Sequence, residues 1–203
     1  MKVFYACFIL FFYVATIHSH AQEISFRDTV AAYNASRLKI NKTGMDVLGA
    51  WGLANVAAGG VGYFTAKQDE WKYFHAMNAL WGLTNTGIAA LGLAGARKEM
   101  DAKLNANQSY DRYRANKRLY LVNAALDVVY IATGVGLAAY STTAKNNVAL
   151  FRGFGKSIAL QGVFLLIFDN CMFAAHQRYN SKWFRLMNEI RVSNTSVAFN
   201  YTL

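Results

Sequence analysis

Four blocks of mostly apolar residues recur along the 203-residue chain, separated by shorter polar links. Each block is about as long as the ~20 residues that a membrane-spanning helix needs. Together they cover residues 44–64, 75–96, 119–140 and 155–175. Because short links place consecutive helices side by side and antiparallel, the pattern predicts an all-α, up-and-down transmembrane bundle over residues 44–176. A soluble bundle of fully buried helices is the alternative, since periodicity does not separate the two.

Both flanks of these blocks differ from them. A basic start, an apolar stretch and small residues just before position 22 are typical of a cleavable signal peptide over residues 1–21, with an uncleaved anchor as the alternative. Residues 22–43 are expected to form a polar or interfacial segment. In the C-terminal tail, residues 177–203, the last seven positions alternate apolar and polar as in a strand.

Composition supports the membrane class. The chain is 55% apolar and 16% charged, whereas soluble domains carry charge on about a quarter of their residues. It contains no proline, which suits uninterrupted helices. These values exclude a disordered chain and a disulfide scaffold.

The net charge of +10 is unevenly placed. Without Lys2 of the leader, fifteen of the 21 Lys and Arg residues lie in 22–43, in 97–118 or in the tail. The predicted topology brings these segments to one end of the bundle, here called the basic end. The positive-inside rule places this end in the cytoplasm, whereas a cleaved leader places it outside. The leader, which acts first, is favoured; dominance of the charge rule and export to an outer membrane are the alternatives.

Small and polar residues recur at helical spacing and predict the inward faces. In the second block this stripe contains Asn78, Gly82, Asn85 and Ala89. A short element, WGLxN, occurs at 51–55 and again at 81–85, which indicates a duplicated helix pair or chance similarity. The residues predicted to mediate helix packing are Trp51, Gly52, Trp81, Gly82, Gly134 and Gly162.

Polar side chains inside the four blocks form the candidate site. Counted along the helices, Asp127 and Asp169 reach the same depth below the basic end, with Asn55 and Asn85 just beneath them. Such a group, with Gln161, is a candidate ion, proton or ligand site. The structural alternative is that the acids only form hydrogen bonds that fix helix register.

Enzyme and metal motifs are absent from the sequence. It has no HExxH, GxSxG, phosphate loop or nucleotide fingerprint, and no Cys or His cluster at metal-ligand spacing. Cys171 is expected to be a small buried residue and His176 an anchor at the membrane interface. We therefore expect no catalysis, no cofactor and no metal.

Several strings in this chain resemble a family of small membrane proteins. They are EWKYFHAMN at 70–78, WGLTN at 81–85, NAALDV at 123–128, GKS at 155–157, and LQGVFLL with FD between 160 and 169. In combination they resemble domain-of-unknown-function family 6992 over about residues 39–176. The resemblance implies a bacterial, helical membrane protein without an assigned activity. It also implies that Asn78, Asn85, Asp127, Gln161 and Asp169 belong to the family pattern.

The sequence favours a non-enzymatic accessory or scaffold protein of the cell envelope, in the inner membrane rather than the outer. The alternative is a small proton- or ion-coupled transport or binding module that uses the two acids. Expected partners are the lipid bilayer, anionic headgroups at the basic end, and a second copy or another envelope protein. Nucleic-acid binding is not expected, because no aromatic and basic platform is evident.

Overall fold

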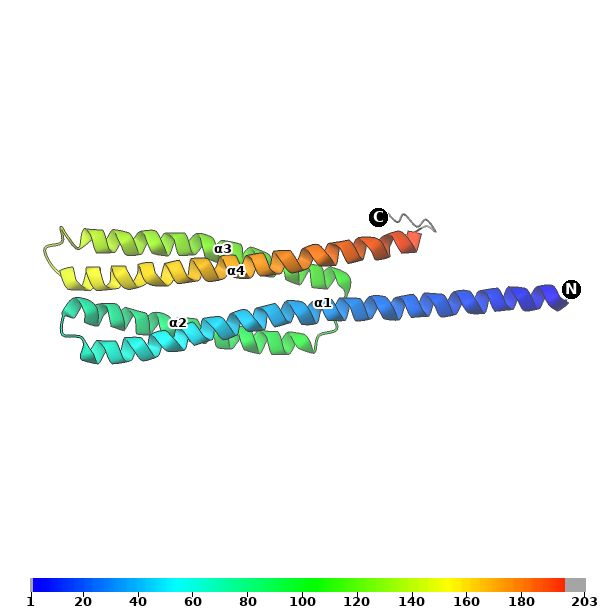
Figure 1. Ribbon diagram of the computed structural model, residues 1–203, viewed down its shortest axis with the longest axis horizontal. Helices are drawn as coiled ribbons and strands as arrows, with labels where there is room; N and C mark the ends of the chain where they lie inside the picture. The colour runs from blue at the N-terminus through cyan, green and yellow to red at the C-terminus, as the bar shows by residue number, and fades with distance from the viewer. Residues whose placement is uncertain (1, 196–203) are drawn as a thin grey trace.

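The computed structural model contains four helices, drawn in Figure 1. They are α1, α2, α3 and α4, with the bounds Lys2–Thr65, Asp69–Met100, Ala106–Tyr140 and Val148–Thr195. The backbone is described for residues 2–195 and the side chains for residues 27–181. Over this part of the chain there is no strand, so the predicted all-α class is confirmed. The strand-like alternation at 197–203 lies outside the described residues.

Short links connect each helix to the next one along the chain. α3 begins with a capping box, in which the Asn105 side chain accepts from the Gln108 backbone and the Gln108 side chain accepts from the Asn105 backbone. Before α4, Asn147 takes a left-handed conformation with φ of 57°, which asparagine tolerates better than most residues. The predicted polar link at 97–118 is mostly helical, because α2 and α3 extend into it.

Two close-packed hairpins make up the bundle, and glycines set their spacing. In the α1/α2 hairpin, a Cβ on Gly82 would lie 2.5 Å from the carbonyl oxygen of Gly52, and one on Gly52 would lie 2.7 Å from that of Gly82. The two WGLxN elements therefore meet backbone to backbone. In the α3/α4 hairpin, Gly134 and Gly155 make the same reciprocal approach, at 2.7 and 2.6 Å.

The hairpins join through α2 and α4 rather than through α2 and α3. Gly153 of α4 lies against the α2 backbone at Phe74, and Glu70 of α2 pairs with Lys156 at 2.6 Å and Arg152 at 3.5 Å. No Cα atom of α2 lies within 8 Å of one of α3. The expectation that α2 and α3 pack as neighbours was wrong, because these α4 contacts draw α2 across the bundle.

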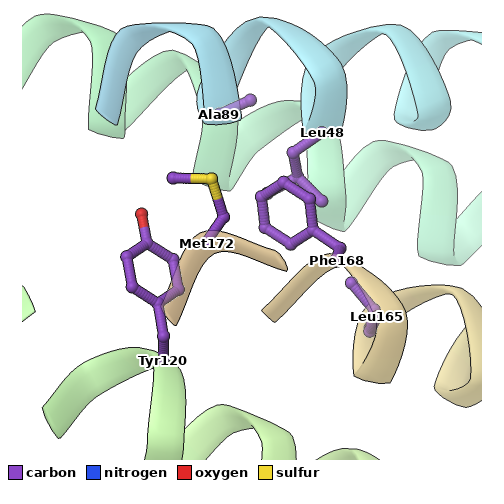
Figure 2. Packing of buried hydrophobic residues seen from close by; sticks show 6 residues of the cluster. All are labelled: Leu48, Ala89, Tyr120, Leu165, Phe168 and Met172. Carbon is purple, nitrogen blue, oxygen red and sulfur yellow. The ribbon is translucent and has the colours of Figure 1, made fainter. Parts of the chain in front are cut away.

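All four helices contribute to the central apolar cluster. Figure 2 shows its six buried members, from α1 to α4 in order: Leu48, Ala89, Tyr120, Leu165, Phe168 and Met172. Elsewhere, more polar than apolar side chains are buried, and many large apolar residues are exposed. The stripe through Asn78, Gly82, Asn85 and Ala89 is buried, as predicted.

Cys171 is an example of an apolar residue that lies on the surface of this bundle. It is exposed, so the expectation that it would be buried was wrong. The outward surface of this bundle is the apolar one, and apolar character therefore does not indicate burial here.

Three of the four helices are long and apolar enough to cross a membrane. They are Arg27–Thr65 of α1, the whole of α3, and Val148–Ser181 of α4. α2 is not among them, because glycine, asparagine and threonine lower its hydropathy. α1 runs without a break from Lys2, so the predicted leader, the 22–43 segment and the first span share one helix (Figure 1). The signal peptide stays a prediction.

The close glycine crossing in the α1/α2 hairpin predicts that the effect of a Gly→Ala substitution on stability depends on its position in α2. Gly82→Ala forces α1 and α2 apart, because its Cβ would overlap the Gly52 carbonyl, and should cost about 1–3 kcal/mol of unfolding free energy. Gly87→Ala on the same helix meets open space and should be neutral or stabilising by up to ~1 kcal/mol. Thermal unfolding in detergent measures both; equal midpoints for the two variants would contradict the close crossing.

Candidate functional site

The polar interior divides into two groups rather than the single cluster expected from helix depth. Gln161 of α4 is the centre of the first. Its amide nitrogen donates to Asn55 of α1 at 2.7 Å and to Asn78 of α2 at 2.9 Å, and its oxygen accepts from the Trp51 indole at 2.8 Å. Ser157 donates to the same Asn78 oxygen at 2.8 Å. This network ties three helices together.

Both amide atoms of Gln161 have hydrogen-bond partners, and the network around it is well packed. Asn55 uses its own amide nitrogen to donate to the Trp51 carbonyl one turn back, at 2.8 Å. The Trp51 ring stacks on Phe164, with centroids 3.9 Å apart. Because each buried amide here has partners, we interpret this group as a hydrogen-bond network that stabilises the packing of the helices.

The second group surrounds a cavity of about 420 Å³ and includes both acids. Asp127 of α3 and Asp169 of α4 line this cavity and are close enough to interact with each other, and Asn85 of α2 lines it too. These residues are 2%, 3% and 1% exposed. Asp127 Oδ2, Asp169 Oδ1 and Asn85 Nδ2 have no hydrogen-bond partner among the residues that the structure describes.

The cavity exists because α2 and α3 are separated. Residues from both helices line it, and α1 and α4 supply the remaining wall. Trp81 of α2 and Tyr130 of α3 meet edge to face at 5.2 Å, bridging the two helices. Ile88 of α2 and Leu126 of α3 also line the cavity and are half-exposed.

The charge of the cavity is one-sided. Its 17 lining residues include two carboxyl groups and no Lys, Arg or His. The side-chain region that the structure describes holds no group of three or more His, Cys, Asp or Glu residues arranged for a metal ion. Two close acids without a basic partner favour a proton or a positively charged guest.

A family model matches residues 47–170, described as a family of unknown function (DUF6992). The chain belongs to this family. No curated protein and no solved structure matches it. The matched part, the DUF6992 region, contains both polar groups and the cavity's acids.

The predicted packing residues of the DUF6992 region lie at the helix contacts. Trp51 and Trp81 face the two polar groups, as described above, and the glycines of both hairpins make the backbone crossings. Gly162 of α4 lies against α3, where a Cβ would come within 2.9 Å of Ile131 and 3.1 Å of the Asp127 carbonyl. Gly162 thus helps to set the distance between the helices that bear the two acids.

Beyond the DUF6992 region, the basic end contains a buried ion pair that no pattern in the sequence predicted. Arg37 of α1 is 1% exposed and pairs with Glu99 of α2 at 2.6 Å. Exposed Arg112 of α3 approaches the same carboxylate at 3.6 Å. No signal in the sequence separates Arg37 from the other cations of the basic end, since its burial depends on the helix extensions packing together.

His176, also outside the DUF6992 region, is buried rather than interfacial. It hydrogen-bonds Asn41 of α1 at 2.8 Å and stacks on Tyr120 of α3, with ring centroids 5.6 Å apart. The expectation of an exposed anchor was wrong because α4 continues past residue 175 and keeps His176 inside the bundle.

The Gln161 network predicts that replacing Gln161 by an apolar residue of similar volume lowers the stability of the protein. Gln161→Met keeps the volume but removes three hydrogen bonds, two of them buried, and leaves the Trp51 indole without its acceptor. We expect a loss of about 1–3 kcal/mol in unfolding free energy, measured by thermal or denaturant unfolding. Leu160→Met, at the exposed neighbouring position, should stay within about 0.5 kcal/mol of wild type. A Gln161→Met protein as stable as wild type would show that the network is dispensable.

Proposed function

We propose that this protein is a non-enzymatic membrane protein that binds a positively charged guest, a proton included, at Asp127 and Asp169. The observation that carries the proposal is the pair of buried, unpartnered carboxylate oxygens facing a cavity without a cationic side chain. An ionised carboxylate away from water is costly unless it is paired, so a cation or proton relieves that cost.

Residence in a bilayer is supported by the surface of the bundle. Three helices are long and apolar enough to cross a membrane, and leucine, isoleucine and valine side chains are exposed along all four. In water such a continuous apolar surface would favour aggregation, whereas lipid tails solvate it.

The geometry supports a role in binding the guest rather than in transporting it through the bundle. The cavity lies toward the basic end, next to Asn41 and Tyr120. The half of the bundle nearer the α1–α2 link holds the hydrogen-bonded Gln161 network and the glycine crossing of Gly52 with Gly82. A guest held at the acids therefore faces close helix packing on that side.

An accessory or scaffold role in the envelope is the second candidate, favoured by the exposed cations of the basic end. Lys39, Lys98 and Arg118 are exposed there, on three different helices. Anionic headgroups would contribute about 1 kcal/mol per cation near the membrane surface. In this role the acids would only fix helix register, and no guest would be needed.

Neutralising the acid pair distinguishes the two roles. In wild type, at least one of Na⁺, K⁺, methylammonium, tetramethylammonium or H⁺ should raise the unfolding midpoint by about 3–6 °C at ten times its Kd. The rise should vanish in Asp127→Asn/Asp169→Asn and persist in Asp111→Asn, which removes an exposed acid of α3. Thermal unfolding in detergent at constant ionic strength measures it.

Protons are tested by repeating the comparison in acidic and alkaline buffers, with Tyr120, Tyr130 and His176 as the other titratable groups nearby. The same response of wild type and the double variant to every cation would refute the cation site and favour the scaffold role.

A further inference from the structure

We propose that the guest is an amphiphilic organic ammonium ion, which enters the cavity sideways between α2 and α3 with its charged head toward Asp127 and Asp169. This inference rests on the cation site proposed above and names the chemical class of its ligand. It follows from the size of the cavity, the gradient of polarity along it and the position of its opening.

Size argues against an inorganic ion alone. Protein pockets for small organic molecules have volumes of about 300–1,000 Å³, and this cavity of about 420 Å³ falls among them. A bare ion needs a tight shell of oxygen ligands, as Mg²⁺ and Ca²⁺ sites show. Here two carboxylates and scattered amides face a space that an ion would leave mostly empty.

Polarity changes from the mouth of the cavity to its interior. The lining residues nearest the surface are apolar: Ile88 is 50%, Leu119 55% and Leu126 46% exposed. The unpartnered oxygens of Asp127 and Asp169 are almost completely buried. A ligand that matches both ends has an apolar body at the mouth and a positive charge inside.

Aromatic rings near the acids suit a substituted ammonium head. Trp81, Tyr120, Tyr130 and Phe168 line the cavity, one from α2, two from α3 and one from α4. Aromatic rings attract ammonium groups through their quadrupole, more strongly when the site is desolvated. Asn85 Nδ2 leaves its two N–H donors for a water molecule or a ligand oxygen.

The opening faces the same surface as the exposed apolar side chains. Ile88 and Leu126 belong to the two helices whose Cα atoms stay more than 8 Å apart, and both continue the apolar outer face of the bundle. A ligand already dissolved in the bilayer would reach the acids between these two helices without crossing an aqueous phase.

The test uses the full chain in lipid nanodiscs and three probes measured by equilibrium dialysis against empty nanodiscs. The probes are benzyltrimethylammonium, its neutral isostere neopentylbenzene, and tetramethylammonium, which has the head but no apolar body. We expect saturable binding of benzyltrimethylammonium, at least about tenfold tighter than tetramethylammonium and lost by a similar factor in Asp127→Asn/Asp169→Asn.

Substitutions at the opening test the entry route. Ile88→Trp narrows it and should weaken benzyltrimethylammonium binding at least about fivefold or slow its association by that factor. Leu91→Trp, on the same helix, exposed and outside the cavity lining, is the matched control and should bind like wild type. Circular dichroism and thermal unfolding verify that each variant folds.

The outcomes separate this inference from the cation site itself. The inference would be overturned if neopentylbenzene bound as tightly as benzyltrimethylammonium, or if tetramethylammonium or K⁺ did. It would also be overturned if Ile88→Trp had no effect on benzyltrimethylammonium binding. If an inorganic cation or H⁺ still stabilises wild type but not the acid-pair variant, the cation site stands. If no cation distinguishes the two proteins, both proposals fail.

Discussion

This bundle has an apolar exterior and a polar interior, and the structure depends on one constraint: the buried polar groups must find hydrogen-bond partners. Few large apolar side chains are buried between these helices, so close backbone contact and internal hydrogen bonds must hold them together. Glycine pairs provide the contact in each hairpin, and Gln161 provides the bonds between hairpins. Every polar group placed inside must then find a partner or remain costly.

Against that background the two polar groups differ in kind. In the Gln161 network both amide atoms of Gln161 have partners, and its hydrogen bonds join three helices, as expected of a structural element. The acids have oxygens left over, in a space that neither the packing of α2 on α4 nor the aromatic bridge of Trp81 and Tyr130 fills. Packing that fastens α2 to α4 also separates α2 from α3, so the fold that stabilises the bundle creates the cavity.

Much of the architecture could be predicted from residues alone. The stripe through Asn78, Gly82 and Asn85 predicted the inward face of α2, because helical periodicity and the scarcity of polar groups in an apolar block leave one sensible orientation. Depth counting correctly placed Asp127 near Asp169, since both lie at similar distances from helix ends at the basic end. It wrongly merged Asn55 with them, because depth says nothing about rotation between helices. Gln161, which the sequence analysis added to the same group, also belongs to the other network.

By itself, the sequence determined the number of helices, their inward faces and several of the glycines that lie at helix contacts, because each follows from local periodicity and residue size. Only the tertiary structure decided which helices are neighbours, that Arg37 and His176 are buried, and that the acids face a cavity while Gln161 does not. These depend on side-chain contacts between helices distant in sequence, such as Glu70 with Lys156, whose geometry a linear pattern does not encode.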